Sequence, residues 1–296
     1  MEPVITDCTL CPRQCHADRT RGQGFCGGGG KVKLARAALH MWEEPPISGT
    51  QGSGTIFFSG CSLGCVFCQN EKISHQDFGK AVSLERLAEI CDELIAQGAH
   101  NINFVNPTHY AHVLKALLER HPLPVPVVYN TGGYDKVDTL KCLEGLVNIY
   151  LPDLKYLDGE TARRYSGAAD YPTVATAAIR EMVRQTGPCQ FDEAGLLTRG
   201  VIIRHLILPG QLSQAKAVMD WVAREFAPGT VLFSLMSQYT PWGDLESRFP
   251  EINRRLRPGE MRAAQEYMGN LGLAGFTQER TSAKEEYTPP FDLTGL

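Results

Sequence analysis

The sequence predicts an α/β fold whose central sheet is built from parallel strands. From about residue 50 onward, short β-branched apolar runs alternate with segments in which apolar residues repeat at helical spacing. The alternation occurs six times, and right-handed crossovers between successive strands make these strands parallel. A chain of 296 residues can bury a substantial core. The expected architecture is a six-stranded partial barrel or an open, doubly wound sheet.

Each strand is expected where a short apolar run is bounded by polar or turn-forming residues. The six predicted strands are Thr55–Ser59, Asn101–Val105, Val125–Tyr129, Asn148–Leu151, Val201–Leu208 and Val231–Leu235. The first helix is expected to begin after Ser83, a good N-cap, and to end before Gly98, where a C-terminal glycine belongs. The other predicted helices are His109–Glu119, Asp135–Glu144, Tyr171–Gln185, Ser213–Phe226 and Pro258–Leu271.

Composition and charge exclude several classes of protein. Hydrophobic content of 43% and charged content of 21% are ordinary for a soluble globular protein. A net charge of −4 gives no reason to expect nucleic-acid or membrane binding. Residues 1–7 do not resemble a signal peptide, and no apolar run approaches the ~20 residues of a membrane span. A cytoplasmic location is expected.

The ten cysteines are grouped, which favours metal ligation over disulfides. Seven of them fall in two tight clusters in a chain without an export signal, a pattern typical of metal sites in a reducing cytoplasm. Cys91, Cys142 and Cys189 stand alone. Cys91 and Cys142 lie in helix-like patterns, so we expect them to pack in the core.

The second cluster, Cys61, Cys65 and Cys68, has the spacing C-x3-C-x2-C with an aromatic residue before its last member. Soft thiolates suit an iron–sulfur cluster, and three of them leave one iron of a [4Fe–4S] cluster open to bind a cofactor. The alternatives are a zinc site or a set of buried thiols. Zinc usually needs a fourth Cys or His nearby, and the nearest is His75.

This cysteine motif, placed directly after the first strand, resembles the signature of the radical S-adenosylmethionine (radical SAM) superfamily. The resemblance implies that the open iron binds the amino and carboxylate groups of SAM. It also implies reductive cleavage of SAM to a 5′-deoxyadenosyl radical, which abstracts hydrogen from a substrate. By the same resemblance the fold is a partial (β/α)6 TIM-like barrel, with its active residues at the C-terminal ends of the strands.

Several polar side chains follow the predicted strands. Asn130 suits ribose hydroxyls, and Asp153 and Lys155 alternate onto one side of an extended segment, where they can grip an amino-acid zwitterion. Arg204 lies within an apolar strand and needs an anionic partner, which the SAM carboxylate would supply. His205 points the other way and is expected to be structural. The loop Asn106–His109 has no acidic residue, so its backbone carbonyls would have to receive the SAM amino group.

The runs Asp153–Lys155 and Ile203–Gly210 resemble their equivalents in pyruvate formate-lyase activating enzyme. That resemblance implies a glycyl radical enzyme as the partner and a flavodoxin- or ferredoxin-type reductant. Gln238 stands where the activase family has a SAM-contacting histidine, and it could substitute for that histidine. Two alternatives stay open: a radical SAM enzyme acting on a peptide or small metabolite, and a non-catalytic iron–sulfur electron-transfer or metal-binding protein.

Residues 1–48 are expected to form a cysteine- and glycine-rich N-terminal module of loops. Cys8, Cys11, Cys15 and Cys26 make a complete ligand set for a second [4Fe–4S] cluster or a zinc ion, with reduced thiols that bind no metal as the alternative. Glu43 and Glu44 connect this module to the barrel and are expected to be solvated, with the alternative that one of them lines the substrate mouth. The barrel is expected over residues 49–280 and a C-terminal tail over residues 281–296.

Overall fold

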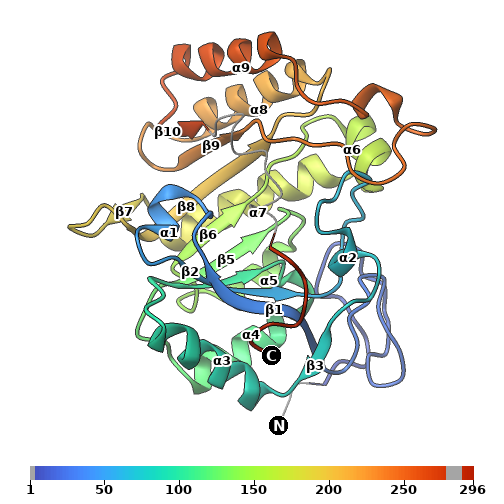
Figure 1. Cartoon of the computed structure of the whole chain (residues 1–296), viewed down its shortest axis with the longest axis vertical. Coiled ribbons are helices and arrows are strands. Elements are labelled where there is room, and N and C mark those ends of the chain that lie inside the picture. Colours follow the sequence, from blue (N-terminus) through green and yellow to red (C-terminus); the bar gives the residue numbers. More distant parts are fainter. Residues whose placement is uncertain (1–3, 278–288) are drawn as a thin grey trace.

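The computed structural model describes residues 4–277 and 289–296, and its centre is one curved, open sheet (Figure 1). The predicted strands are β2 (Ser53–Phe58), β4 (Ile102–Val105), β5 (Val127–Thr131), β6 (Ile149–Pro152), β8 (Leu197–Leu206) and β9 (Leu232–Met236). They lie next to one another in this order, and every neighbouring pair is parallel. The sheet does not close on itself, so the prediction of a partial barrel is confirmed.

Four further strands of the described residues were not predicted: β1 (Val32–His40), β3 (Lys80–Val82), β7 (Gln190–Phe191) and β10 (Gly275–Thr277). β1 pairs antiparallel with β2 and extends the sheet toward β3, whereas β10 adds a parallel strand beside β9. The expectation that residues 1–48 are all loops is therefore wrong for residues 32–40. Val32 and Leu34 are buried in the core, which draws this part of the front segment into the sheet.

Six helices lie within or close to the predicted ranges: α3 (Leu84–Ala96), α4 (Ala111–Arg120), α5 (Val137–Lys141), α7 (Tyr171–Thr186), α8 (Leu212–Glu225) and α9 (Pro258–Asn270), although α5 is much shorter than its predicted range Asp135–Glu144. The Ser83 hydroxyl accepts a hydrogen bond from the backbone N–H of Arg86, and Gly98 has a positive φ just after α3, as expected. The shorter helices are α1 (Pro45–Ser48), α2 (Glu71–Ser74), α6 (Gly159–Ser166), η1 (Thr108–Tyr110) and η2 (Pro250–Ile252).

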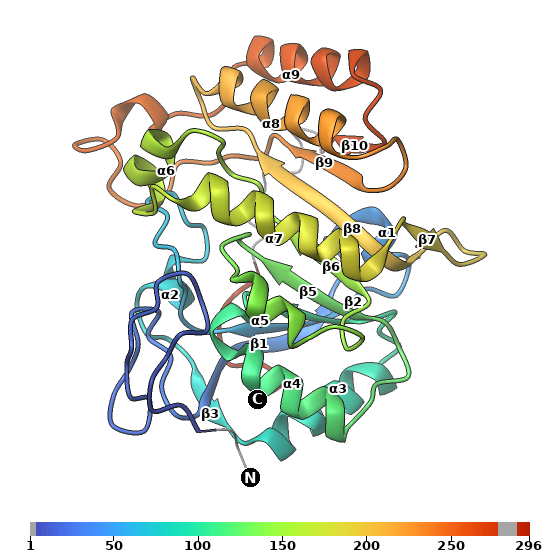
Figure 2. The same ribbon diagram turned by 180° about the vertical axis from the view of Figure 1, so that it is seen from behind.

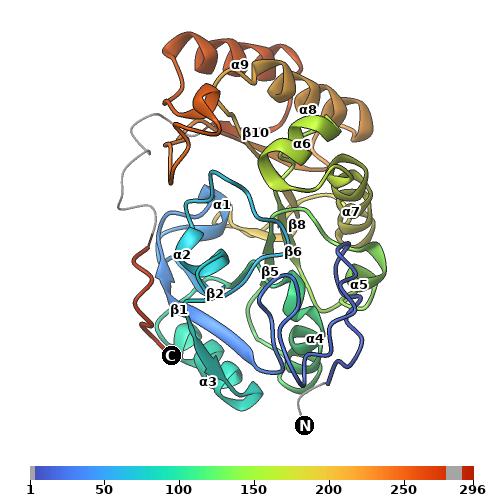
Figure 3. The same ribbon diagram turned by 90° about the vertical axis from the view of Figure 1, so that its right-hand side faces the viewer.

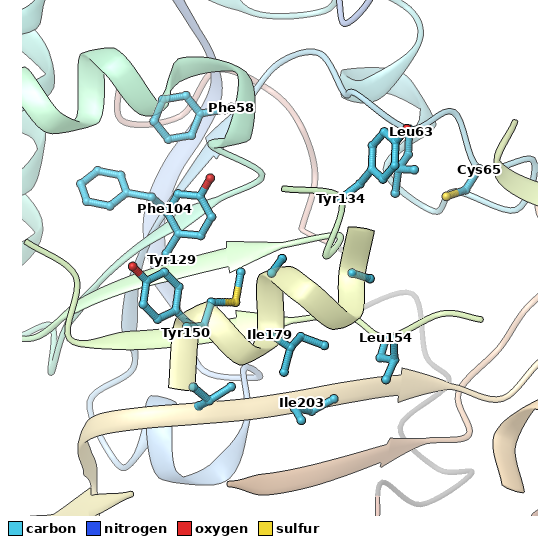
Figure 4. Packing of buried hydrophobic residues seen from close by; sticks show 14 of the residues in the cluster. Phe58, Leu63, Cys65, Phe104, Tyr129, Tyr134, Tyr150, Leu154, Ile179 and Ile203 are labelled. Carbon is cyan, nitrogen blue, oxygen red and sulfur yellow. The ribbon is translucent and has the colours of Figure 1, made fainter. Parts of the chain in front are cut away.

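The helices α3, α4, α5, α7 and α8 cover the outer, convex face of the sheet (Figures 2 and 3). Because successive side chains of a strand point to opposite faces, each strand contributes to two cores. Tyr129, Tyr150 and Ile203 point outward and pack with Ile179 of α7 (Figure 4). On the inner face, the strand residues next to these outward-pointing ones pack against Ile47 of α1, which closes the bottom of the barrel. These inward residues are Val128, Ile149, Leu151 and Ile202.

The end of the chain returns to β1. The backbone of Leu293 donates to Ala35 at 3.1 Å, and that of Ala37 donates to Thr294 at 2.9 Å. The Phe291 ring meets Phe57 edge-on, with ring centroids 5.4 Å apart. The predicted tail begins at residue 281, and its residues 281–288 lie outside the described residues.

Two lone cysteines behave differently. Cys91 is fully buried in α3, so the prediction of core packing is confirmed for it. Cys142 is exposed, and the same prediction is wrong for it, because α5 ends at Lys141 and Cys142 follows it on the exposed side of the chain. No helix within the described ranges is long and apolar enough to cross a membrane.

Candidate functional site

A cavity of about 280 Å³ lies at the C-terminal ends of the parallel strands. Its lining includes every site residue that the sequence predicted for the barrel: Cys61, Cys65, Cys68, Asn130, Asp153, Lys155, Arg204 and Gln238. The strand alternation explains why these groups meet. Asn130, Asp153 and Arg204 share the inward face of their strands with Val128, Leu151 and Ile202. A larger depression of about 490 Å³ beside α6 contains no cysteine among its lining residues.

The cysteine loop is held by its own backbone and by neighbouring hydroxyls. The N–H of Cys68 donates to the carbonyl of Cys65 at 3.2 Å, which turns the two thiols toward the same side. The Cys65 sulfur lies 3.0 Å from the hydroxyl of Ser166, and the Cys68 sulfur lies 3.3 Å from that of Ser74. Ser166 and Ser74 were not singled out in the sequence, because neither belongs to the cysteine motif.

The protonation of these thiols fits a metal site. Burial raises the pKa of Cys61 to about 12, and the neighbouring Cys65 and Cys68 thiolates raise it further. The pKa of Cys68 is raised in the same way, first by burial and then by Cys65. Cys61 and Cys68 therefore lose their protons readily only when a cationic centre binds beside them.

The side chains of this loop suit a cluster better than a single ion. Across the described residues, no three Cys, His, Asp or Glu side chains converge on one point as a single metal ion requires. A [4Fe–4S] cluster does not need such convergence, because each thiolate binds a different iron. One buried and two partly buried thiols that line the same cavity therefore fit the cluster that the sequence predicts.

Opposite the cysteines, Asp153 lies between two cations. Its carboxylate accepts from the Lys155 ammonium at 2.6 Å and from the Arg204 guanidinium at 2.9 Å. Burial alone would raise the pKa of Asp153, but the charges of Lys155 and Arg204 outweigh it and hold the pKa below its usual value. Arg204 also donates to the side-chain oxygen of Asn130 at 2.7 Å. Asp153 therefore supplies one anionic partner for Arg204 within the protein itself.

Two acidic residues that were expected to lie in solvent lie in the cavity instead. The Glu43 side chain is 10% exposed, and its carboxylate lies 3.7 Å from Arg204 and 3.5 Å from the amide nitrogen of Asn130. Glu44 is 2% exposed and accepts a hydrogen bond from Ser234 at 3.0 Å. The expectation that both are solvated is wrong. They directly precede α1, whose Ile47 is anchored inside the barrel and carries them inward.

Two amide side chains border the cysteines and the far wall. Asn106, with a positive φ of 58°, donates from its amide to the carbonyl of Gly60 at 2.6 Å, so it fixes the loop after β4 to the start of the cysteine loop. The buried side-chain oxygen of Gln238 has no hydrogen-bond partner among the described residues. A buried acceptor without a partner is costly, so Gln238 is suited to receive a donor from a ligand.

The two histidines near the strand ends contact backbone carbonyl groups, as structural histidines do. His205 points to the outer face, and its Nδ1 lies 2.7 Å from the carbonyl of Leu154, as expected of a satisfied structural histidine. His109 is fully buried, and its Nε2 lies 2.7 Å from the carbonyl of Ser59. Neither residue lines the cavity.

The four cysteines of the front segment are brought near one another. Burial raises the pKa of Cys11 to about 11, and the proximity of Cys26, Cys8 and Cys15 raises it further. The Cys8 thiol also lies within hydrogen-bonding reach of Cys15. The segment packs beside the barrel, where Arg13 donates to the carbonyl of Ser62 at 2.9 Å.

Comparison with known proteins agrees with this geometry. The family model of the radical SAM superfamily matches residues 55–189. Uncharacterized protein MJ0674 of Methanocaldococcus jannaschii is 30% identical over 285 residues, which cover 91% of this chain and 76% of the archaeal protein. The chain belongs to the radical SAM superfamily, and membership implies a [4Fe–4S] cluster and SAM as cofactors.

Solved structures share the fold at low sequence identity. SuiB of Streptococcus suis superposes with a TM-score of 0.51 at 15% identity, over 77% of this chain and 50% of the SuiB chain. The complex of SuiB with the precursor peptide SuiA gives the same score, over 75% of this chain and 48% of that one. The present chain thus spans about half the length of SuiB.

Proposed function

We propose that this protein is a radical SAM oxidoreductase that cleaves SAM reductively and abstracts hydrogen from a glycine of a partner protein, a glycyl radical enzyme. The observation that supports it most is the single cavity shared by three cysteines and by the polar ends of four parallel strands. When bound, the cluster and SAM supply the electron and the 5′-deoxyadenosyl radical. The protein's own residues hold and orient these groups.

Each polar residue of the cavity has a role in this proposal. Cys61, Cys65 and Cys68 hold the cluster. Arg204 and Lys155 face the carboxylate of SAM, with Asp153 fixing both cations in place at 2.9 and 2.6 Å. Asn130 lies toward the ribose, and Gln238 receives a donor at its unpartnered oxygen.

The loop after β4 has no acidic residue to receive the amino group of SAM. In this proposal Glu43 takes that role. Asp153 is already engaged by two cations at short range, whereas Glu43 is held only by contacts of 3.5 Å or more to Asn130 and Arg204. A buried carboxylate with such loose partners can accept an ammonium group at little cost. We therefore assign Glu43 to the amino group of SAM.

The size of the cavity supports a large substrate that reaches in from outside. Ligand pockets usually measure about 300–1,000 Å³, and this one, at about 280 Å³, is small for a site that would hold a cluster, SAM and a substrate together. A loop or peptide that enters through the unclosed side of the barrel needs to insert only one residue. A peptide substrate is the second candidate. SuiB, which shares the fold, is described in complex with a precursor peptide.

The test is an anaerobic assay of the reconstituted, reduced protein with SAM. Release of 5′-deoxyadenosine establishes the cleavage. Addition of glycyl radical enzymes from the same genome should then produce the doublet signal of a glycyl radical in electron paramagnetic resonance. If all of them stay silent while a peptide drives stoichiometric release of 5′-deoxyadenosine, the peptide candidate replaces the activase proposal. If SAM is never cleaved, the enzymatic proposal itself fails.

A further inference from the structure

The front segment buries a positive charge against its cysteines. Arg19 is 3% exposed, and no carboxylate of the described residues lies within ion-pair distance of it. Its Nη1 donates to the carbonyl of His109 at 2.5 Å, its Nη2 lies 3.6 Å from the sulfur of Cys26, and its Nε has no partner within the described part of the chain. A buried guanidinium without an anion is strongly unfavourable, so the neighbouring sulfurs must supply negative charge.

The sulfurs are also placed to accept hydrogen bonds. The backbone N–H of Gly28 points at the sulfur of Cys26 at 3.4 Å. Amide donors directed at sulfur stabilise a thiolate and are one of the protein's means of tuning an iron–sulfur cluster.

Glycines leave the room that this arrangement requires. A Cβ on Gly28 would stand 3.1–3.2 Å from His109, from Arg19 and from the Cys26 sulfur. A Cβ on Gly24 would stand 3.3 Å from the sulfur of Cys15 and 3.7 Å from that of Cys26. The two sulfurs therefore flank Gly24, and any side chain there would intrude between them.

We propose that Cys8, Cys11, Cys15 and Cys26 bind a second iron–sulfur cluster whose negative charge is balanced by the buried guanidinium of Arg19. Four thiolates on a [4Fe–4S] cluster carry a net negative charge, which is the partner that Arg19 lacks. Reduced thiols would be neutral and would leave Arg19 unpaired. Zinc, which requires four sulfurs about 2.3 Å from one ion, is the alternative that the test below distinguishes.

The proposed cluster is joined to the barrel. The N–H of Cys61, the first cysteine of the barrel loop, donates to the carbonyl of Cys26 at 3.0 Å. Gly60, with a positive φ of 91°, allows this approach, since a Cβ on it would stand 2.3 Å from the same carbonyl oxygen. Metal binding by Cys26 therefore fixes the position of the backbone from which Cys61 projects.

The test separates this site from the SAM cluster. In a variant with Cys61, Cys65 and Cys68 all changed to Ala, the full chain should still bind about four iron ions and show the visible absorption of an iron–sulfur cluster after anaerobic reconstitution. The further change of Cys8, Cys11, Cys15 and Cys26 to Ala should abolish both. The proposal is overturned if the triple variant folds but takes up no iron, or if it binds one zinc ion instead of iron. Neither readout depends on SAM cleavage, so failure of the proposed function leaves this test intact.

The role of Arg19 is tested in the same triple variant by the reduction potential of the remaining cluster. Removal of a positive charge disfavours the reduced, more negative state, so Arg19→Gln should shift the midpoint to a more negative potential. Arg19→Lys should restore part of the shift. Arg21→Gln is the matched control, because Arg21 lies in the same segment with its side chain 88% exposed. Equal midpoints in the Arg19→Gln and Arg21→Gln proteins would contradict the proposed charge balance.

Discussion

The guanidinium of Arg204 on β8 and the carboxylate of Asp153 at the end of β6 lie 2.9 Å apart, and the two residues also form a parallel β-bridge. The bridge puts two inward-facing positions side by side, and Lys155 completes the group from the other side of the carboxylate. The cavity thus contains cations that are already oriented before any ligand binds. Fixed charges of this kind bind a ligand with little reorganisation.

Asp153→Asn should destabilise the protein. It removes a carboxylate that lies within 3 Å of two largely buried cations, and breaking a fully buried ion pair costs about 3–5 kcal/mol, which is the upper limit here. Chemical denaturation of the reconstituted protein measures the free energy of unfolding. Glu119→Gln is the control, because it breaks the exposed pair of Glu119 with Lys115 on α4, which is worth at most about 0.5 kcal/mol. An effect of Asp153→Asn no larger than that of the control would mean that the cations are satisfied by other groups.

Glu43→Gln should weaken SAM binding without a comparable loss of stability. The substitution keeps the shape of the side chain and removes the charge that faces the amino group of SAM, so we expect the dissociation constant to rise at least tenfold, equivalent to about 1.4 kcal/mol. Equilibrium dialysis under anaerobic conditions measures it. Arg204→Ala should weaken binding more, by about 2–5 kcal/mol.

An exposed acid provides the comparison for both variants. Glu85→Gln on α3 should leave SAM binding unchanged, because Glu85 lies far from the cavity lining. If Glu43→Gln binds SAM as tightly as Glu85→Gln does, Glu43 is not the partner of the amino group. An unchanged constant for Arg204→Ala would likewise remove Arg204 from the carboxylate site.

His205 should make the protein less stable in mild acid. Burial lowers the pKa of His205 to about 4, whereas an unfolded histidine titrates near 6.5. Between these values the unfolded chain binds more protons than the folded one, so stability rises with pH. The contribution is complete above about pH 6.5 and is lost as the pH falls toward 4.

This dependence can be measured as the slope of the free energy of unfolding between pH 7 and 5. His205→Gln should have a shallower slope than the unchanged protein, by at most about 1.4 kcal/mol per pH unit. His75→Gln replaces an exposed histidine and should keep the original slope. Identical slopes in all three proteins would show that His205 does not titrate differently in the folded and unfolded states.

The directions of the side chains at the strand ends could be predicted, because successive side chains of a strand point to opposite faces of the sheet. Once Val201–Leu208 is read as a strand, Arg204 and His205 must point to opposite faces, and the structure places them so. The sequence could not predict the partner of Arg204, because Asp153 lies 51 residues away and its side chain could equally have faced a ligand.

The front of the chain was harder to interpret from local patterns. β1 follows a glycine run and has weak alternation, and its strand character comes from pairing with β2, a tertiary contact. Glu43 and Glu44 are polar residues before two prolines, which ordinarily indicates an exposed turn. They are buried because Ile47 occupies the interior of the barrel. No pattern in residues 41–48 predicts the contact of Ile47 with the inner face.

The most direct test of the account is the yield of 5′-deoxyadenosine from SAM in freshly reconstituted, reduced protein. The unchanged protein and the exposed-cysteine control Cys142→Ala should both release it. Cys65→Ala should remain folded and release none, because the cluster then lacks one of its three thiolates. A yield from Cys65→Ala equal to that of the Cys142→Ala control would contradict the assignment of Cys61, Cys65 and Cys68 as the ligands of the catalytic cluster.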